Sequence, residues 1–553
     1  MPFALAGMPV NLMAENALTE MARASLDNDR VLIVLQMHGG NDGLNCLIPV
    51  SDYELYYSKR ANIAIPARNS ARKYIPLDST LPIDQQVGLH PDMMAMKQMY
   101  DRGRVAMVQG VSYKNNNGSH FRGRDIQFMG GTHDEYLQSG WVGRYLQQEI
   151  APARYPEDFP NSGMKDPLAI EMGNDVSLIF HQQGNIPTSI SINDPIGFAN
   201  LVEELEGFLD EHIDPRGIPP AYLQDSPYFN ELDWILSLED KSKDFAARLA
   251  EVYRTGDKIT GYAHYPETYP FNAPKGSLKN QLTHQLKIIA RLLSGGCRTK
   301  VFLIKTGGFD THADQVESYD PTMGVHAALM YHISTAMSAF QEDLRTRGLE
   351  DRVLTLTTSE FGRRIYSNGS YGTDHGTGGP IFIFGKGVKA GVVGKVPDLT
   401  KANVEMQYDY RVVYGNIMKD WLLVPDERLN EIFPGLMSES GTSDEVKFEA
   451  LPLAKQVITG TNEFIYSRFS LDGCHPNPVR DKTNFRFRIN STQSVSMRLY
   501  DRNGKEVMLL TDQEYTPGVH DFVADLSALP SGLYQYQMKS GFFKDSKSLV
   551  IVK

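Results

Sequence analysis

Cysteine is scarce in this chain of 553 residues, and the three that occur, Cys46, Cys297 and Cys474, lie far apart. No Cys-x-x-Cys pair is present, which argues against a disulfide framework and against a zinc site built from thiolates. Positive charge is not in excess either. The formal net charge is -12, so we expect no nucleic-acid partner. No apolar run approaches the roughly 18–20 residues of a membrane-spanning helix, so we expect no transmembrane segment.

The chain is too long for one ordinary domain, and its length predicts two or three. Residues 1–29 form the first segment. It opens with the mildly apolar MPFALAGMPVNLMA but lacks the basic residues with which a signal peptide begins. Two interpretations stay open for this segment: the remnant of an export leader, and an ordinary chain end.

Residues 30–435 alternate between apolar runs and helical patterns. Runs such as RVLIVLQM at 30–37 and KVFLIKT at 300–306 are typical of buried strands, and each is followed by a loop rich in glycine or polar residues. Amphipathic patterns that end in glycine lie at 90–103, 278–296 and 326–348. This order predicts an α/β domain with a mostly parallel sheet flanked by helices. The less regular stretch 150–275 is interpreted as an insertion that caps this core.

The character of the chain changes after this domain. Residues 436–468, which include SESGTSDE, are predicted to be a linker. From 469 to 553, short segments alternate polar and apolar residues and are separated by turn signals such as DRNGK and LPSG. Such a pattern predicts a small all-β sandwich.

Polar side chains adjoin the ends of the predicted strands in the α/β domain. In an open parallel sheet, ligands bind at the carboxyl ends of the strands, so we expect these side chains to meet at one edge. They are His38, Asn41 and Asp42; Ser119 and His120; Asp310, His312 and Asp314; Glu360 and Arg363; Asp374 and His375. Carboxylates packed together need a cation, and Asp, Glu and His suit zinc, manganese, magnesium or calcium. The sequence therefore predicts a site for divalent metal.

Ser119 has two interpretations, which do not exclude each other. It can cap the N-terminus of the helix that follows, or it can be a nucleophile at that helix end, with His120 as the fallback catalytic residue. Each of the other pieces, taken alone, also has a structural explanation as a turn or a helix start. Their coincidence at one sheet edge is what favours a metal site.

The loops resemble, in this order, a large bacterial family of unknown function, number 1501 of its series. That family is usually classed as a distant branch of the alkaline phosphatase and sulfatase superfamily. The matching stretches, between about residues 30 and 400, are HGGNDGLN, GSHFRGRD, SGWVGRYL, GGFDTHADQ, SEFGRR, NGSYGTDHGTGGP and GVVGKVP. The resemblance implies an alkaline-phosphatase-like fold.

The resemblance also implies roles for single residues. It implies that Ser119 is the nucleophile. It also implies that the metal ligands are Asp42, Asp310, His312, Glu360 and His375. The residue after Glu360 is Phe361, where many relatives have a histidine, so the number of metal ions, one or two, stays open. A replacement ligand would come from His38, His120 or Asp314.

The C-terminal segment resembles the sorting domain of type IX secretion in Bacteroidetes. HPNPV, MRLYDRNGKEV, LSALPSGLYQYQM and the closing KSLVIVK carry this resemblance over about 475–553. It implies export, handling by the type IX secretion machinery, and release from or attachment to the outer surface of the cell.

These observations predict a secreted metal-dependent hydrolase of phosphate or sulfate esters, with a small molecule or a glycan ester as substrate. Arg363, or Arg122 or Arg124, would bind the oxygens of the transferred group in fork geometry. Asp374 would orient His375. The alternative is a non-catalytic surface protein that keeps the metal site for stability or for binding a glycan.

Overall fold

The computed structural model describes residues 28–206, 243–257, 263–436, 446–455, 470–471, 473–489, 493–502, 505–516, 518–540 and 543–553, with the backbone of 4–5 and 8–9. Contacts divide the chain into two units, Asp29–Lys455 and Met1–Asn28 with Gln456–Lys553. Most of the predicted N-terminal segment 1–29, of the linker 436–468 and of the middle of the stretch 150–275 lies outside the described residues.

A nine-stranded sheet forms the centre of the larger unit. Its order is β11 (Ser189–Ile192), β8 (Ala169–Met172), β12 (Val301–Thr306), β3 (Val31–Met37), β13 (Val353–Thr358), β14 (Gly379–Phe384), β7 (Val105–Ser112) and β15 (Gly391–Val393), with β16 (Tyr408–Asp409) also on β7. Only β14 runs antiparallel to its neighbours, so the mostly parallel sheet is confirmed. Every residue of β3 is buried, because helices cover both faces of the sheet.

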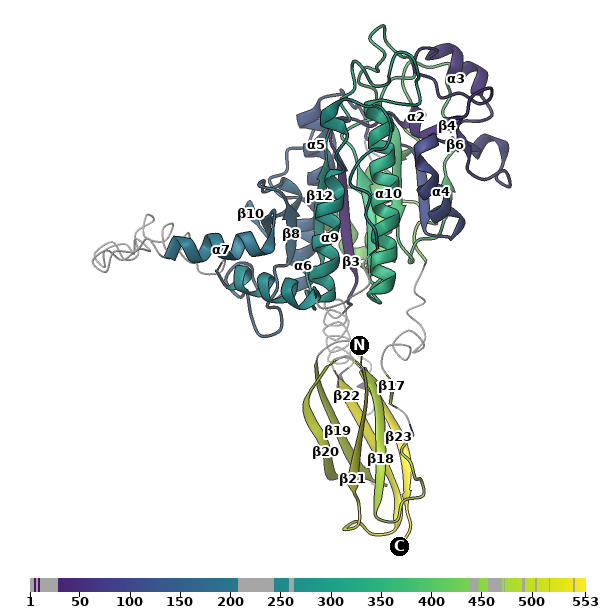
Figure 1. Ribbon diagram of the computed structural model, residues 1–553. Helices are drawn as coiled ribbons and strands as arrows, with labels where there is room; N and C mark the ends of the chain where they lie inside the picture. The colour runs from purple at the N-terminus through teal and green to yellow at the C-terminus, as the bar shows by residue number, and fades with distance from the viewer. Residues whose placement is uncertain are drawn as a thin grey trace, which may run out of the picture. The chain divides into compact units, whose positions relative to one another are not determined.

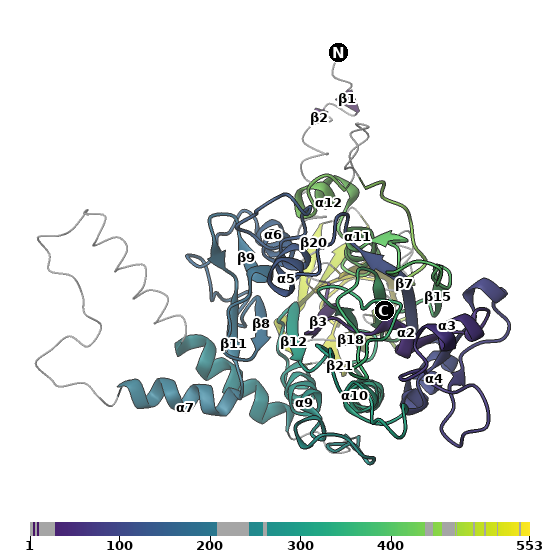
Figure 2. The same ribbon diagram turned by 90° about the horizontal axis from the view of Figure 1, so that it is seen from above.

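The helices form a layer on each face of this sheet (Figure 2). One layer holds α4 (Met94–Asp101), α9 (Gln281–Ser294) and α10 (Val325–Thr346). The other holds α5 (His120–Met129), α6 (Trp141–Ile150), α11 (Tyr410–Asp420) and α12 (Asp426–Ile432). The apolar side chains of the first layer share one large core with the strands, as the amphipathic patterns predict.

The remaining elements of the larger unit lie around this core (Figure 1). They are α2 (Gly43–Cys46), β4 (Leu47–Pro49), α3 (Tyr53–Lys59), β5 (Ile75–Pro76), β6 (Val87–Leu89), β9 (His181–Gln182), β10 (Ile186–Pro187), α7 (Pro195–Glu206), a helix over 243–256, and 3-10 turns at Ile83–Gln85, Pro91–Met93, Leu178–Phe180 and Lys275–Ser277. The stretch 150–275 does more than cap the core, since its strands β8 and β11 extend the sheet. Both strands are four residues long, too short to stand out as apolar runs.

Every described strand of the smaller unit pairs antiparallel, including the short N-terminal pair β1 (Ala4–Leu5) and β2 (Met8–Pro9). One sheet holds β17 (Ser470–Leu471), β18 (Lys482–Ile489) and β21 (Gly518–Asp525); the other holds β20 (Glu506–Tyr515), β19 (Gln493–Asp501), β22 (Gly532–Ser540) and β23 (Phe543–Ile551). Phe485 of one sheet and Tyr536 of the other pack in a shared core, with ring centroids 4.8 Å apart. The predicted all-β sandwich is therefore confirmed. Among the described helices of the whole chain, none is long and apolar enough to cross a membrane.

Candidate metal centre

Three side chains converge at the carboxyl edge of the large sheet. His120 begins α5, Asp310 follows β12, and His375 precedes the antiparallel β14, whose first residue lies at the same edge. One ligand atom from each lies within 4.8 Å of the others. The Asp310 carboxylate is 3.3 Å from His375 Nε2 and 3.5 Å from His120 Nε2. Two imidazoles and a carboxylate thus surround one point, as the strand ends predicted.

His312 brings a fourth donor to this cluster. Its Nε2 lies 3.2 Å from Asp310 Oδ1 and 2.8 Å from His375 Nε2. The contacts of Nδ1 in His312 and in His375 determine whether the Nε2 atom of each ring carries a proton or a lone pair. His375 Nδ1 is 2.8 Å from the Gly118 carbonyl, which can only accept, so Nδ1 carries the proton and Nε2 presents its lone pair.

His312 is oriented from behind in a similar way. Its Nδ1 lies 3.5 Å from Asp374 Oδ1, and Asn368 donates to the same carboxylate oxygen at 3.1 Å. A proton on Nδ1 leaves the Nε2 lone pair of His312 facing that of His375. Two facing lone pairs repel unless a cation or a shared proton lies between them. The hydrogen bonds of this chain therefore leave both Nε2 atoms able to share a cation or a proton.

His120 supplies a second sign of a metal site. Both of its ring nitrogens are buried and have no hydrogen-bond partner in the part of the chain that the structure describes. Burial lowers the pKa of His120, although Asp310 opposes the shift. A neutral, unpartnered imidazole beside a carboxylate fits a ligand for a divalent ion. Donor sets rich in imidazole suit zinc better than calcium, magnesium or manganese, which prefer oxygen donors.

Arg363 holds the loops of the site together. Its side chain is 0% exposed. It donates hydrogen bonds to the carbonyls of Gly39, Gly40, Phe309 and Thr373. It also donates to Asp310 Oδ1 at 2.6 Å. Burial acts to raise the pKa of Asp310, but Arg363, His375 and His120 together hold it below its usual value. The structure thus places Arg363 behind the metal cluster, where it fixes Asp310 rather than facing a substrate.

Glu360 lies beside the cluster and bridges two histidines. Its carboxylate accepts the backbone N–H groups of Gly39 and Gly40 at 3.0–3.2 Å, which their left-handed backbone directs toward it. His38 Nδ1 lies 2.7 Å from Glu360 Oε1, and this contact raises the pKa of His38. His120 Nδ1 is 3.9 Å from the same oxygen. Glu360 and His38 therefore form a pair next to the candidate metal ligands, in which the carboxylate is buried and the imidazole is half-exposed.

Three of the predicted residues are not brought to the cluster. Asp42 is buried, and its carboxylate accepts hydrogen bonds from Arg60 at 2.9 and 3.0 Å and from Gln315 at 2.6 Å. Asn41 is buried beside it, and its side-chain oxygen accepts from Cys46. Asp314 is exposed. The Arg60 ion pair satisfies Asp42, so this carboxylate has no need of a metal ion.

Ser119 is the N-cap of α5. Its Oγ accepts the backbone N–H of Arg122 at 3.3 Å, so the capping interpretation is confirmed. The residue lies between Gly118, whose carbonyl accepts a hydrogen bond from His375, and the candidate ligand His120. The hydroxyl is therefore adjacent in sequence to two residues that position the candidate metal centre.

Phe361 forms an apolar wall of the site. Its ring centroid lies 4.4 Å from that of His375 and 4.8 Å from that of His120. On its other side, a Cβ placed on Gly40 would meet the Phe361 ring at 2.3 Å. The phenyl ring fills the space that the resemblance assigns to a histidine ligand.

His326 on α10 is a site neighbour that the sequence reasoning did not single out. Its Nε2 lies 3.4 Å from Asn41 Oδ1 and 3.8 Å from Cys46 Sγ, and the residue is 1% exposed. In the sequence it is one more histidine in an amphipathic helix, with no local signal of its role. Burial lowers the pKa of His326 to about 4, against the opposing effect of Asp42.

The pH dependence of stability follows from this shift. The folded-state pKa of His326 lies below its ordinary value of 6.5, so the unfolded chain takes up the proton first as pH falls. The stabilisation from the neutral ring is present above about pH 6.5 and is lost between about 6.5 and 4, by about 3 kcal/mol in total. Urea unfolding at pH 7 and 4.5 should show a smaller acid loss in His326→Gln than in the wild type. Equal losses in both proteins would contradict this account.

Two family models match the chain. The model described as "Protein of unknown function (DUF1501)" matches residues 267–437, and the model described as "Secretion system C-terminal sorting domain" matches 474–552. The resemblances stated from the loops and from the C-terminal segment are thereby confirmed. The first match includes Asp310, His312 and His375. The second indicates a secreted or surface-attached protein that is handled by type IX secretion.

The comparison with curated proteins finds no match. Among solved structures, the chain is similar to a protein in the alkaline phosphatase superfamily from Vibrio parahaemolyticus, with 9% identity, 90% of this chain and 91% of that chain covered, and a TM-score of 0.32. The chain is also similar to the PsFucS1 sulfatase from Pseudoalteromonas sp., with 11% identity, 92% of this chain and 87% of that chain covered, and a TM-score of 0.31. A third similar structure is alkaline phosphatase from the Antarctic bacterium TAB5, with 11% identity, 65% of this chain and 92% of that chain covered, and a TM-score of 0.25.

Proposed function

We propose that this chain is an exported metal-dependent hydrolase of phosphate or sulfate esters. The observation that supports this most is the convergence of His120, Asp310 and His375, which each bring one ligand atom within 4.8 Å of the others, while the two ring nitrogens of His120 have no hydrogen-bond partner among the described residues. His312 is the fourth donor. A bound divalent ion supplies a Lewis acid that lowers the pKa of a nearby hydroxyl and offsets charge on the transferred group.

The proposal is for one ion rather than two. The resemblance implies that Asp42 is a metal ligand, but its carboxylate accepts hydrogen bonds from Arg60 and Gln315 instead. Phe361 takes the place of a further ligand, and its ring packs on His120 and His375. These features leave one set of donors, in the described residues, that is arranged for a cation.

Ser119 is the proposed nucleophile. Its Oγ forms a bond to the phosphorus or sulfur of the ester, the hydroxyl proton is released to water, and the bond to the leaving oxygen breaks. His38 donates a proton to that leaving oxygen, because Glu360 raises its pKa and its side chain is 51% exposed. Water then attacks the Ser119 ester and releases phosphate or sulfate.

Arg124 takes the role that the sequence analysis gave first to Arg363. The Arg363 guanidinium is used by backbone carbonyls and Asp310. Arg124 is on α5, its side chain is 37% exposed, and its charge acts on His38. Its ion pair with Asp125, at 3.2 Å, is solvent-exposed, and we propose Arg124 as a cation that meets the equatorial oxygens of the ester.

The test separates the two roles of Ser119. Ser119→Asn keeps a capping acceptor but has no hydroxyl, whereas Ser119→Thr keeps both. We expect Ser119→Asn to unfold within a few degrees of the wild type and to lose turnover of p-nitrophenyl phosphate or sulfate by about 10³-fold or more. Ser119→Thr should retain measurable turnover. If Ser119→Asn hydrolyses the ester as fast as the wild type, Ser119 only caps the helix.

The non-catalytic alternative is favoured by one observation. Asp42 was expected to bind metal and Arg363 to bind substrate. Instead, Asp42 accepts a hydrogen bond from Arg60, and Arg363 donates one to Asp310. Under that alternative the purified protein binds one divalent ion but hydrolyses neither ester, with or without chelator. Turnover that a chelator abolishes and added zinc or manganese restores would exclude it.

A further inference from the structure

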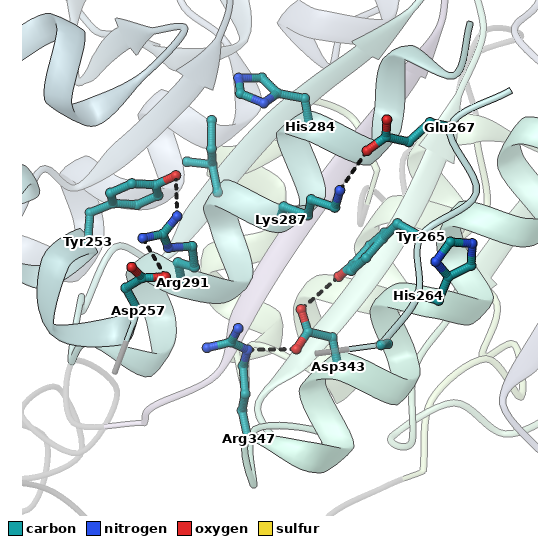
Figure 3. A pocket seen from close by; sticks show the side chains of 12 residues that line it. Tyr253, Asp257, His264, Tyr265, Glu267, His284, Lys287, Arg291, Asp343 and Arg347 are labelled. Atoms are coloured by element: carbon teal, nitrogen blue, oxygen red, sulfur yellow. Dashed lines mark hydrogen bonds and ion pairs between the residues drawn. The ribbon is translucent and has the colours of Figure 1, made fainter. Parts of the chain in front are cut away.

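Asn117, in the loop between β7 and α5, is exposed and held by few contacts. Its Oδ1 accepts the backbone N–H of Ser119 at 3.0 Å, but its Nδ2 donates to no residue that the structure describes. By contrast, polar side chains that line the cavity in Figure 3 are tied in ion pairs such as that of Lys287 with Glu267, at 2.9 Å. The Asn117 carboxamide is therefore able to change its rotamer.

Gly118 follows Asn117 directly, and this order makes the asparagine chemically labile. The backbone nitrogen of the next residue can attack an asparagine side chain, and glycine has no side chain to hinder the approach. The Ser119 N–H points at Asn117 Oδ1, the oxygen on which negative charge develops during the attack, and the positive end of α5 lies beside it. The Gly118 N–H donates to Asn116 Oδ1 at 3.0 Å, so this hydrogen bond must open first.

A second Asn-Gly pair, Asn368–Gly369, lies on another loop of the metal cluster and is locked in place. Asn368 Nδ2 donates to the His312 carbonyl at 2.8 Å and to Asp374 Oδ1 at 3.1 Å. Its Oδ1 accepts two backbone N–H groups at 2.9 and 3.2 Å. The carboxamide cannot turn toward the Gly369 nitrogen without breaking these hydrogen bonds. Two loops of the same site thus carry a reactive and a protected copy of one dipeptide.

We propose that Asn117 is a site of spontaneous deamidation through a succinimide. The Gly118 nitrogen loses its proton to water and forms a bond to Asn117 Cγ. The bond from Cγ to Nδ2 breaks, and Nδ2 takes a proton from water and leaves as ammonia. A second water molecule opens the ring at either of its carbonyls and leaves aspartate or isoaspartate. The net reaction consumes one water and releases one ammonia, and it needs no oxidant or cofactor.

Deamidation at this position disturbs the anchor of His375. The Gly118 carbonyl accepts a hydrogen bond from His375 Nδ1 at 2.8 Å, and a Cβ placed on Gly118 would meet His375 Cβ at 3.1 Å, so the two segments are in close contact. Isoaspartate inserts one more carbon into the backbone directly before Gly118, and either product adds a negative charge. The converted chain therefore orients His375 less well. Its effect on metal binding rests on the proposed function, whereas the deamidation itself does not.

The experiment is peptide mapping of the full chain by mass spectrometry after incubation at mildly alkaline pH, with an isoaspartyl methyltransferase assay for isoaspartate. In the folded chain we expect Asn117 to convert at least about tenfold faster than Asn368, because Asn368 reacts only after local opening. In urea, where neither loop keeps its contacts, the two rates should be similar. The proposal is overturned if Asn117 converts no faster than Asn368 in the folded chain.

The matched variant is Asn117→Gln, whose longer side chain would have to form a larger ring and reacts more slowly. After incubation, the wild type should show faster amide hydrogen exchange at 118–123 and around His375, and its zinc affinity should fall by about 10–100-fold. Incubated Asn117→Gln should show neither change. Equal changes in both proteins would show that conversion of Asn117 does not release His375.

Hydrogen exchange and mass are both read without metal, which separates the two proposals. A fresh chain that binds no zinc would contradict the proposed function, yet deamidation of Asn117 and faster exchange around His375 would still be expected. A fresh chain that binds zinc but keeps Asn117 intact would contradict only the deamidation.

Discussion

On the proposed function, replacing His375 with alanine is expected to abolish binding of a divalent ion and, with it, the hydrolysis of phosphate or sulfate esters. His375 Nε2 lies 3.3 Å from Asp310 Oδ1 and 2.8 Å from His312 Nε2, so it is the donor that joins these two ligands. Its loss leaves His312 and His120 on opposite sides of a gap. We expect zinc or manganese affinity to fall by more than about 100-fold, beyond the usual effect of losing a residue that only orients a ligand.

The measurement is metal content after dialysis, together with the rise in melting temperature on adding zinc or manganese. An ion present at 100 times its dissociation constant stabilises the wild type by about 2.7 kcal/mol, and this gain should vanish in His375→Ala. Asp374→Asn should lose only about 10–100-fold in affinity, because Asp374 orients His312 from behind.

The control is His133→Ala, since His133 contacts Asn115 and is not in the cluster. It should bind metal like the wild type. Full metal content in His375→Ala would show that the cluster is not the metal site.

The sequence predicted the parts of the site that follow from sheet topology. Asp310 and His375 are 65 residues apart, yet each adjoins a strand end, and parallel strands bring such ends to one edge. The apolar runs at Val31–Met37 and Val301–Thr306 were long enough to identify as buried strands. The direction of β14 was not readable, because a six-residue strand looks the same in either direction.

The partners of Asp42 could not be predicted from the sequence. It directly follows a GGN loop at a strand end and looks like a ligand, but Gln315, its hydrogen-bond partner, is 273 residues away. Nothing local indicates that the chain returns Arg60 and Gln315 to neutralise it. A buried carboxylate needs a partner, and the sequence cannot say whether that partner is a metal ion or an arginine.

Arg363→Met is expected to destabilise the larger unit by about 3 kcal/mol or more, because each buried carbonyl that loses its donor costs about 1–3 kcal/mol. The substitution leaves the Asp310 carboxylate without its 2.6 Å partner and removes a donor from carbonyls of three separate loops. Arg363→Lys keeps the charge, but one ammonium group cannot point in all these directions, so it should recover only part of the loss. Urea unfolding without metal or substrate measures both effects.

The same variants decide whether Arg363 acts on substrate or on the loops. A substrate-binding arginine replaced by lysine would raise KM and leave stability and metal affinity unchanged. If the buried Arg363 guanidinium only holds the loops, the opposite result is expected. Arg363→Lys should then lose stability and metal affinity even without ester, because Asp310 is no longer fixed beside His375. Arg124→Lys is the matched control, since its side chain is 37% exposed and should change KM without changing the unfolding midpoint. If Arg363→Lys unfolds like the wild type and only KM rises, the guanidinium faces substrate after all, and the loops at this sheet edge are held by other contacts.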